Sequence, residues 1–249
     1  MFGFRQGLAA FLPRLSQMSS QPSTVSPTGR LFFGINALVA WLGLAVSFVL
    51  ALFGSYPSTN TDPTLVGFNA QGLEGAIGRV SDFLGYFTHW SNLVVAIVMT
   101  MLWRNSKRNS TLFSVLRLDS LIMITVTGLV YALILAPADT VQGWQYISNT
   151  LEHYLTPLLT ILIFIIFGPR RQIRLGAVLP ALILPLVWVG IALIRGAIIG
   201  AYPYGFINVA TWGYGTVTIN LIGIIVIGTG LGLFFWAIER WMSKLEARK

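Results

Sequence analysis

A hydroxyl and an imidazole stand just inside two apolar segments of this chain: Thr88 in the string Tyr-Phe-Thr-His-Trp-Ser-Asn, and His153 in the string Glu-His-Tyr. A threonine hydroxyl is a weak nucleophile that needs a base within hydrogen-bond reach, and histidine is the commonest such base. Polar side chains kept at similar depths in different membrane helices predict a functional site. Thr88 and His153 are therefore the candidate catalytic pair of a covalent hydrolase.

The composition places this pair in a membrane. The chain has 249 residues, of which 55% are hydrophobic and 10% charged, and its mean hydropathy is +0.75. Several apolar runs reach the ~20 residues that a helix needs to cross ~30 Å of hydrocarbon. The predicted fold class is all-α, a polytopic membrane protein with six transmembrane helices in one bundle, at 31–53, 84–103, 117–136, 151–168, 176–200 and 216–238.

Two shorter segments flank this transmembrane domain of residues 31–238. Residues 1–30 are predicted to be a cytoplasmic N-terminal segment that is partly disordered, because 16–29 are rich in Ser, Pro, Thr and Gln. Met18 offers an alternative start to Met1. Residues 239–249 are predicted to be a basic cytoplasmic tail.

The basic residues predict the topology. The net charge is +8, and fourteen of the sixteen Lys and Arg residues precede the first helix, follow the sixth, or lie between helices two and three or four and five. Cytoplasmic loops are enriched in Lys and Arg, so both termini are predicted to be cytoplasmic. The membrane is predicted to be the cell (plasma) membrane. This distribution indicates membrane topology rather than a surface that binds nucleic acid. No nucleic acid is therefore expected as a partner.

With this topology, polar side chains of several helices meet at one outer depth. Helix two starts outside, and Thr88, Ser91 and Asn92 share one of its faces at i, i+3 and i+4. His89 is turned about 100° away from Thr88 and is not its expected base. His153 enters at a similar depth in helix four. The other residues predicted to line a cavity open to the outer face are Tyr131, Arg195 and Asn220.

Helix four carries its own polar stripe. Asn149, His153, Thr156 and Thr160 are spaced at i, i+4, i+7 and i+11, which predicts a polar face turned to the interior. Pro157 has no amide hydrogen for the carbonyl of His153, so a bend and a free acceptor are predicted there. Prolines and polar stripes also occur in membrane helices without chemistry, so a purely structural role is the alternative.

Several other site classes lack their residues. There is no cysteine, which excludes disulfides and thiolate metal sites. The sequence has no phosphate-binding glycine loop, no metal-ligand cluster and no pair of carboxylates on one helix face, so neither a metal nor another cofactor is predicted. The one haem arrangement left open uses His89 and His153 as its two ligands.

The order and spacing of the motifs resemble a known superfamily. The chain looks like bacterial six-pass membrane proteins that are distant relatives of the animal androgen-induced and androgen-dependent membrane proteins, over about residues 80–225. The matching strings are Phe-Thr-x-x-Ser-Asn from Phe87, His153-Tyr154 with Pro157, Arg195-Gly196-Ala197, and Tyr202-Pro203-Tyr204-x-Phe206 with Asn208.

That resemblance implies an activity. Animal members are threonine hydrolases that cleave fatty-acid esters of hydroxy fatty acids with one intramembrane Thr and one His, which match Thr88 and His153 here. The expected partners are membrane lipid and a lipophilic ester, and the oxyanion would be held by first-turn amides, Asn92 or Arg195. A non-catalytic lipid-binding, small-molecule-binding or transport bundle with the same cavity is the alternative function, and a structural role is the third.

Overall fold

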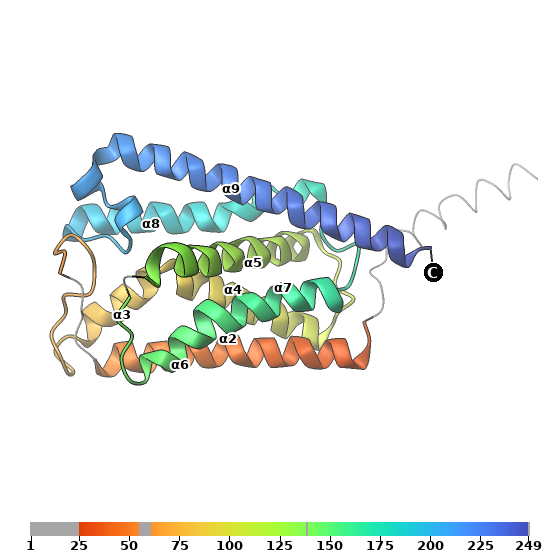
Figure 1. The fold of residues 1–249 in the computed structure, drawn as a ribbon, viewed down its shortest axis with the longest axis horizontal. Coiled ribbons are helices and arrows are strands. Elements are labelled where there is room, and N and C mark those ends of the chain that lie inside the picture. The colour runs from red at the N-terminus through yellow and green to blue at the C-terminus, as the bar shows by residue number, and fades with distance from the viewer. Residues whose placement is uncertain (1–24, 55–60, 138, 249) are drawn as a thin grey trace, which may run out of the picture.

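The computed structural model describes residues 25–54, 61–137 and 139–248. Most of the predicted N-terminal segment therefore lies outside the described residues. The described chain is a bundle of helices (Figure 1). Its elements are α2 Pro27–Phe53, α3 Ala76–Gly85, α4 Phe87–Arg104, α5 Thr111–Val130, η1 Tyr131–Leu135, α6 Gln145–Asn149, η2 Thr150–Leu155, α7 Thr156–Ile166, η3 Leu175–Ala177, η4 Pro180–Leu182, α8 Ile183–Ile199, η5 Gly205–Ile207 and α9 Val209–Glu246.

Five stretches of these helices are long and apolar enough to span a membrane: Pro27–Phe53, Thr111–Leu135, Gln145–Ile166, Leu175–Ile199 and Val209–Glu246. The pair α3 and α4 makes a sixth if it is counted as one span, although the two helices are bent by 68°. The predicted class, an all-α protein with several membrane-spanning helices, is confirmed for the described residues. The second predicted helix is broken rather than continuous.

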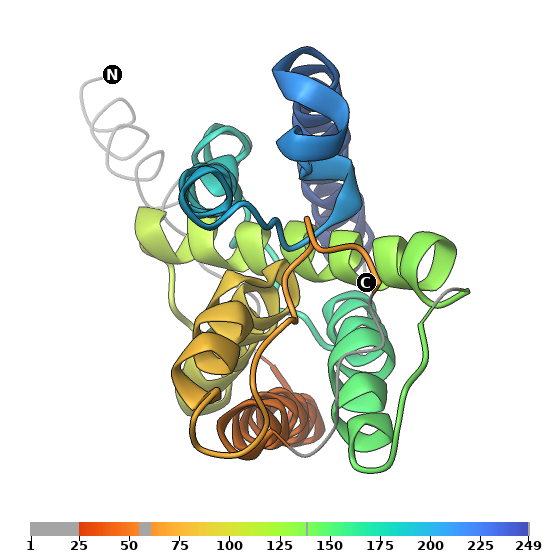
Figure 2. The ribbon, with the colours of Figure 1, turned by 90° about the vertical axis from the view of Figure 1, so that its left-hand side faces the viewer.

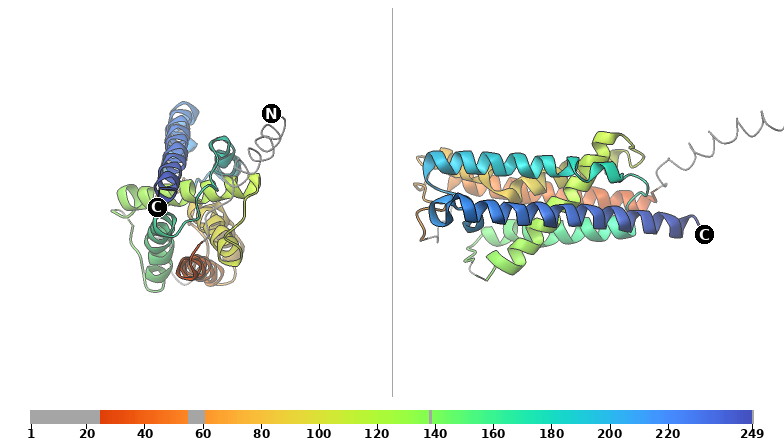
Figure 3. Two further views of the ribbon diagram at one scale, coloured as in Figure 1. Left: turned by 90° about the vertical axis from the view of Figure 1, so that its right-hand side faces the viewer. Right: turned by 90° about the horizontal axis from the view of Figure 1, so that it is seen from above.

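The helices form two groups separated by α5. Viewed along the bundle, α5 crosses at a steep tilt, with α8 and α9 on one side and α2, α4 and α7 on the other (Figures 2 and 3). The helix α3, the short helix α6 and the segment 201–208 lie together at one end, which we call the α3 end, and the C terminus lies at the opposite end (Figure 1). The candidate site lies toward the α3 end.

Small residues let α2 approach α4 closely. Ala40 of α2 and Ala96 of α4 are fully buried in a cluster that also holds Phe33, Val95 and Leu102. Within a bilayer, helices gain little from hydrophobic burial against each other, so close packing of small side chains is a main source of helix association. This contact fixes α4, which carries Thr88.

The break between α3 and α4 falls at Tyr86, whose backbone is extended (φ −80°, ψ 131°). The indole Nε1–H of Trp188 on α8 donates to the carbonyl of Gly85 at 2.9 Å, and the amide of His89 bonds the carbonyl of Tyr86 at 3.2 Å. The Gly85 carbonyl, which would accept a hydrogen bond within a continuous helix, is thus bonded to α8 instead. The break makes Phe87 the first residue of a new helix, α4, with Tyr86 as its N-cap residue.

Two π-helical turns lie beside the same site. In η1 the amide of Ala136 bonds the carbonyl of Tyr131 at 2.8 Å, and in η2 the amide of Thr156 bonds the carbonyl of Leu151. The distortion predicted at Pro157 therefore takes the form of a widened turn that precedes the proline. A Cβ on Gly128 of α5 would lie 3.0 Å from the Pro157 ring, so glycine allows the two helices to meet there.

A loop covers the α3 end of the bundle. The amide of Val66 donates to the carbonyl of Tyr202 at 3.0 Å, and the amide of Tyr202 donates to the carbonyl of Thr64 at 2.9 Å. The side chain of Asn208 also donates to the Thr64 hydroxyl at 2.6 Å. These bonds join the first long connection to the segment 201–208, which leads into α9.

Candidate active site

The hydroxyl of Thr88 and the imidazole of His153 are in direct contact. Thr88 Oγ1 lies 3.1 Å from His153 Nε2, across the junction of α4 and η2. Thr88 is 7% exposed. The two residues are 65 positions apart in the chain, so the contact depends on the packing of α4 against η2. The distance is within the range that general-base activation of a nucleophile requires.

The other nitrogen of the imidazole is bound by Asn149. His153 Nδ1 lies 2.5 Å from Asn149 Oδ1, one helical turn earlier in the chain. The amide nitrogen of Asn149 donates to the Tyr131 hydroxyl at 2.6 Å, and that hydroxyl donates to Asp139 at 2.9 Å. Because the Asn149 nitrogen is committed to Tyr131, its oxygen faces His153 and accepts from Nδ1–H. His153 Nε2 is then left as the acceptor that faces Thr88.

An aromatic ring further restrains the imidazole. The rings of Tyr131 and His153 are stacked, with centroids 3.9 Å apart and planes inclined by 14°. Tyr131 opens the π-turn η1 and His153 lies within the π-turn η2, so the two irregular turns bring the rings together. Contacts to both ring nitrogens and to one ring face hold the base in a single orientation.

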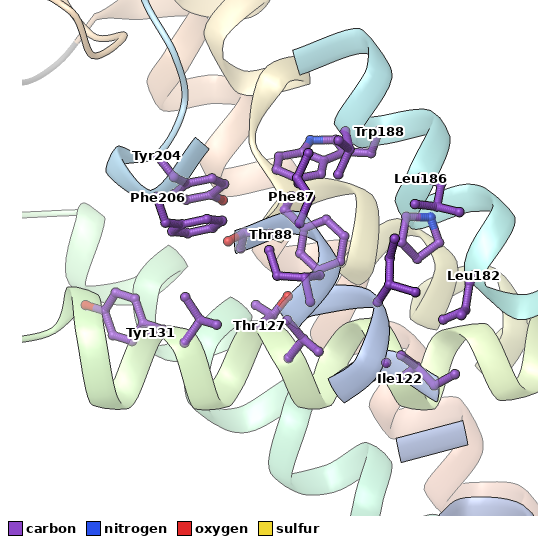
Figure 4. A pocket seen from close by; sticks show the side chains of 18 of the residues that line it. Phe87, Thr88, Ile122, Thr127, Tyr131, Leu182, Leu186, Trp188, Tyr204 and Phe206 are labelled. Atoms are coloured by element: carbon purple, nitrogen blue, oxygen red, sulfur yellow. The ribbon is translucent and has the colours of Figure 1, made fainter. Parts of the chain in front are cut away.

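The new N-terminus of α4 lies beside Thr88. Tyr86 is its N-cap residue and makes no side-chain capping bond. The first amides of a helix have no partner within the helix. Here the hydroxyl of Tyr204 contacts the backbone of Phe87 and both the backbone and the side chain of Thr88. Figure 4 shows this hydroxyl directed at Thr88. Burial raises the pKa of Tyr204 to about 12, so the phenol keeps its proton at neutral pH.

Ser91 and Asn92 hold the backbone of Thr88. The Ser91 hydroxyl donates to the Thr88 carbonyl at 2.8 Å and lies 2.7 Å from the Thr127 hydroxyl of α5. The Asn92 amide donates to the carbonyls of Thr88 at 2.9 Å and Glu152 at 3.2 Å. Both side chains thus fasten the first turn of α4 to its neighbours, and neither has a hydrogen bond to His153.

A cavity of about 150 Å³ extends from Thr88 between the two groups of helices. Thr88, Thr127, Tyr131 and Tyr204 are the hydroxyl-bearing residues of its lining (Figure 4). Most of the remaining lining is apolar and comes from α5, η4, α8 and α9, for example Ile122, Val126, Leu182, Leu186, Leu221 and Ile225. The cavity is therefore mainly apolar, where the sequence predicted a polar one.

Parts of the cavity wall reach the surface of the bundle. Leu186 on α8 is 44% exposed and Ile225 on α9 is 38% exposed, although both line the cavity. These helices are apolar spans whose outer faces would meet lipid. The gap between them is a lateral route by which a hydrocarbon chain could approach Thr88.

Arg195 and Asn220 do not line this cavity and contact other groups. Arg195 forms an ion pair with Asp82 of α3, and its Nε donates to Ser81 at 3.2 Å. The Asn220 amide donates to the carbonyl of Phe206 at 2.8 Å. Arg195 therefore ties α8 to α3. Asn220 holds the segment that carries Tyr204 and Phe206, whose rings are stacked at 5.3 Å.

The second histidine has separate partners. His89 Nδ1 lies 2.6 Å from the Phe83 carbonyl, and Nε2 lies 3.7 Å from Glu152. The two imidazoles thus face different groups, which does not suit two ligands of one haem. No group of three or more His, Cys, Asp or Glu side chains that could hold a metal ion is found in the part of the chain that the structure describes.

Three residues of the site, Asn149, Tyr204 and Asp139, were not among the predicted site residues. Asn149 could have been, since it precedes His153 by four residues on the predicted polar stripe. Tyr204 was noted only within its Tyr-Pro-Tyr string, and its reach to Thr88 depends on how 201–208 folds back. Asp139 had no signal, because a lone acid in a connecting loop is usually solvated.

No family model, curated protein or solved structure matches this chain. The resemblance to the androgen-induced and androgen-dependent membrane proteins stays an expectation from the strings quoted above, and the geometry around Thr88 is the evidence for a function.

Proposed function

We propose that this protein is an intramembrane hydrolase of lipid (fatty-acid) esters, with Thr88 as nucleophile and His153 as general base. The observation that carries the proposal is the 3.1 Å contact between Thr88 Oγ1 and His153 Nε2 at the polar end of an apolar cavity. A binding protein has no need for a hydroxyl in contact with an oriented base. An acyl-transfer enzyme needs both.

The first half of the reaction uses this contact. Thr88 Oγ attacks the ester carbonyl carbon while its proton passes to His153 Nε2. When the C–O bond to the leaving alcohol breaks, the same proton moves from Nε2 to the alcohol oxygen, and an acyl-Thr88 ester remains. The hydrogen bond that His153 Nδ1–H donates to Asn149 Oδ1, with 2.5 Å between the two atoms, stabilises the transient imidazolium.

The second half reverses these roles. Water attacks the carbonyl of the acyl-Thr88 ester and gives a proton to His153 Nε2. That proton returns to Thr88 Oγ as the fatty acid leaves. His153 is thus regenerated as a neutral base, and one water molecule is consumed for each ester bond that is broken.

The oxyanion that forms twice in this cycle has suitable donors nearby. The first-turn amides of α4, at Phe87 and Thr88, lie beside the nucleophile, and the protonated Tyr204 hydroxyl contacts both this backbone and the Thr88 side chain. A helix N-terminus also carries a partial positive charge. Asn92 and Arg195, which were candidates for this role, are bound to other groups. We therefore assign the oxyanion to the amides and Tyr204.

The cavity favours a lipid substrate. Its mostly apolar wall suits an acyl chain, and the partly exposed Leu186 and Ile225 mark a lateral route from the bilayer. Burying apolar surface contributes about 25 cal/mol per Å², so a long chain would bind mainly through this wall. The polar end at Thr88 would then receive the ester group.

An alkyl fluorophosphonate tests the nucleophile, because it forms a stable tetrahedral adduct with an activated hydroxyl. The purified protein should be labelled at Thr88, identified by peptide mass spectrometry. Labelling should be lost in Thr88→Ala and should fall by about 10²- to 10⁴-fold in His153→Ala, the usual contribution of a positioned base.

Thr127→Val is the matched control, because Thr127 lies in the same cavity but is not bonded to His153. It should keep most labelling, and so should His89→Ala. A folded wild-type protein that neither reacts with such probes nor hydrolyses any lipid ester would contradict the proposal. That outcome would favour the alternative, a lipid-binding or transport protein.

A further inference from the structure

Two ionisable residues, Glu152 and His89, lie close together on the same two elements that carry the candidate active site. Glu152 precedes His153 and His89 follows Thr88, so each lies on another face of its helix. Glu152 is 2% exposed, and its Oε2 accepts from the Ser47 hydroxyl of α2 at 2.6 Å. Oε2 also lies 3.7 Å from His89 Nε2.

The hydrogen bonds of His89 fix which of its nitrogens faces Glu152. Phe83 offers a backbone carbonyl, which can only accept, so the nitrogen 2.6 Å from it, Nδ1, must carry a hydrogen. In a neutral imidazole the other nitrogen, Nε2, then has only a lone pair. An ionised Glu152 would place a second acceptor opposite this lone pair. Two facing acceptors are stable only if a proton is added to one of them.

Nothing else nearby neutralises the carboxylate. No Lys or Arg is paired with Glu152 in the described part of the chain. The α2 side supplies only the Ser47 hydroxyl. The remaining titratable groups close by are His153, whose nitrogens are bound to Thr88 and Asn149, and Tyr204. An unpaired charge in a membrane interior is costly, so the site must gain a positive charge.

The side chain of Glu152 is closely packed against α2. A Cβ on Gly43 would lie 2.8 Å from Glu152 Cγ, so only a glycine in α2 leaves room for this side chain. Glu152 Oε1 has no hydrogen-bond partner among the described residues, and Asn92 Oδ1 and Thr156 Oγ1 are likewise buried without one. All of these free atoms are oxygens, and a carbonyl oxygen such as Asn92 Oδ1 requires a donor.

From this geometry we infer that Glu152 and His89 bind one proton between them, in a membrane-buried site separate from Thr88 and His153. The proton resides on the carboxyl or on the imidazole, and in either state the pair has no net charge. Asn92 joins the two sites, because its amide bonds both the Glu152 and the Thr88 carbonyls. The shared proton does not require hydrolase activity, so stability and spectroscopy can detect it without an activity assay.

Glu152→Gln tests the site, because the glutamine amide mimics a permanently protonated carboxyl. The thermal unfolding midpoint of the wild type in lipid nanodiscs should fall from mildly acidic to alkaline pH. The folded protein holds a proton there that an exposed Glu–His pair does not hold at neutral pH, so stability is lost as rising pH removes it. Glu152→Gln should show a smaller decline, because other buried acids such as Asp119 still contribute, and Glu74→Gln, an exposed control, should keep the full decline.

Spectroscopy of the wild type keeps the test decisive if Glu152→Gln does not fold. At neutral pH, infrared spectra should show a buried carboxylic acid, or nitrogen NMR should show His89 protonated on both nitrogens. A carboxylate beside a neutral imidazole would overturn the inference. So would a decline of equal size in wild type and Glu152→Gln, or one that sodium ions reverse at constant pH, which would indicate a bound cation instead.

Discussion

His153 is held by three contacts, and each has a different effect on its chemistry. The Asn149 oxygen fixes the hydrogen on Nδ1, the Tyr131 ring fixes the plane of the imidazole, and Thr88 occupies Nε2. Asn149 is itself aligned through Tyr131 and Asp139. A base that must take and return a proton within one site gains from such restraint, because no reorientation is needed between steps.

Replacement of Asn149 tests this restraint. Asn149→Ala removes the acceptor for Nδ1–H, so the imidazole can rotate or change tautomer, and the rate of Thr88 labelling should fall by about 10²-fold. Asn149→Asp keeps an acceptor for Nδ1–H and loses only the donor to Tyr131, so it should keep most of the rate. The measurement is the time course of fluorophosphonate labelling. Equal rates for wild type and Asn149→Ala would show that Asn149 does not orient the base.

Tyr204 provides a test of the proposed oxyanion site. Tyr204→Phe keeps the ring but loses the hydroxyl donor, and removal of one such donor costs about 10²- to 10³-fold in kcat. KM for a lipid ester should change little. Because burial raises the pKa of Tyr204 to about 12, activity should not be lost through Tyr204 at moderately alkaline pH. A higher KM with unchanged kcat would instead make Tyr204 a binding residue.

The sequence indicated the members of the central contact but not its surroundings. The sequence pairs Thr88 and His153 because the predicted topology puts both at a similar depth near the outer ends of their helices, and the structure places them in contact. Arg195 and Asn220 were grouped with them on depth alone. Depth does not give direction around a helix axis, and both side chains face other partners, Asp82 and Phe206.

At the scale of elements, the site depends on three departures from regular helix. The break at Tyr86 leaves the amides of Phe87 and Thr88 without a partner within the helix, and the π-turns η1 and η2 bring Tyr131 and His153 into contact. Hydrophobic periodicity cannot reveal the break, because Trp188, which captures the Gly85 carbonyl, comes from a helix about a hundred residues later. Only Pro157 signalled a distortion from the sequence, and it did not specify a π-turn.

Trp188→Phe tests the cause of the break. The Gly85 carbonyl would lose its donor in a buried position, which costs about 1–3 kcal/mol. The unfolding free energy in detergent should fall by this amount, and Thr88 labelling should fall with it as α3 and α4 shift. Trp212→Phe, at an indole that is 57% exposed, is the matched control and should have a small effect. Unchanged stability in Trp188→Phe would mean that the break is intrinsic to α3 and α4.

At the scale of the whole molecule, the two ends of the bundle are built differently. The α3 end is covered by loops joined through Thr64 and Tyr202. At the other end, a buried Glu239 on α9 accepts from the amides of Gln172 at 3.3 Å and Ile173 at 2.8 Å, and pairs with Arg117 at 3.5 Å. This network attaches α9, which forms one wall of the cavity, to α5 and the connection after α7.

Removal of Glu239 should therefore loosen α9. Glu239→Ala leaves Arg117 as an unpaired buried charge, and breaking such a pair by removing one partner costs about 3–5 kcal/mol. Glu74→Ala removes an exposed acid at the α3 end and should change the unfolding free energy by no more than about 0.5 kcal/mol. Denaturant unfolding in micelles compares the two. Similar losses would show that the buried network does not hold α9.

The distribution of basic residues predicts which side of the membrane the α3 end faces. Basic residues gather at the opposite end, in the connections that hold Lys107 and Arg170 and after α9, which predicts that this end is cytoplasmic. The chain has no cysteine, so single cysteines can report on each end without background. Lys107, Lys244 and Glu74 are exposed and serve as the three positions.

In intact cells, a membrane-impermeant thiol reagent should modify Glu74→Cys and leave Lys107→Cys and Lys244→Cys unmodified until the membrane is permeabilised. This result would place the candidate active site nearer the outer face, where hydrolytic water and lipids of the outer leaflet can reach it. The opposite labelling pattern would place Thr88 near the inner leaflet and would reverse the side from which water arrives. The internal geometry of Thr88, His153 and Asn149 would be the same in either case, so only the source of substrate depends on this measurement.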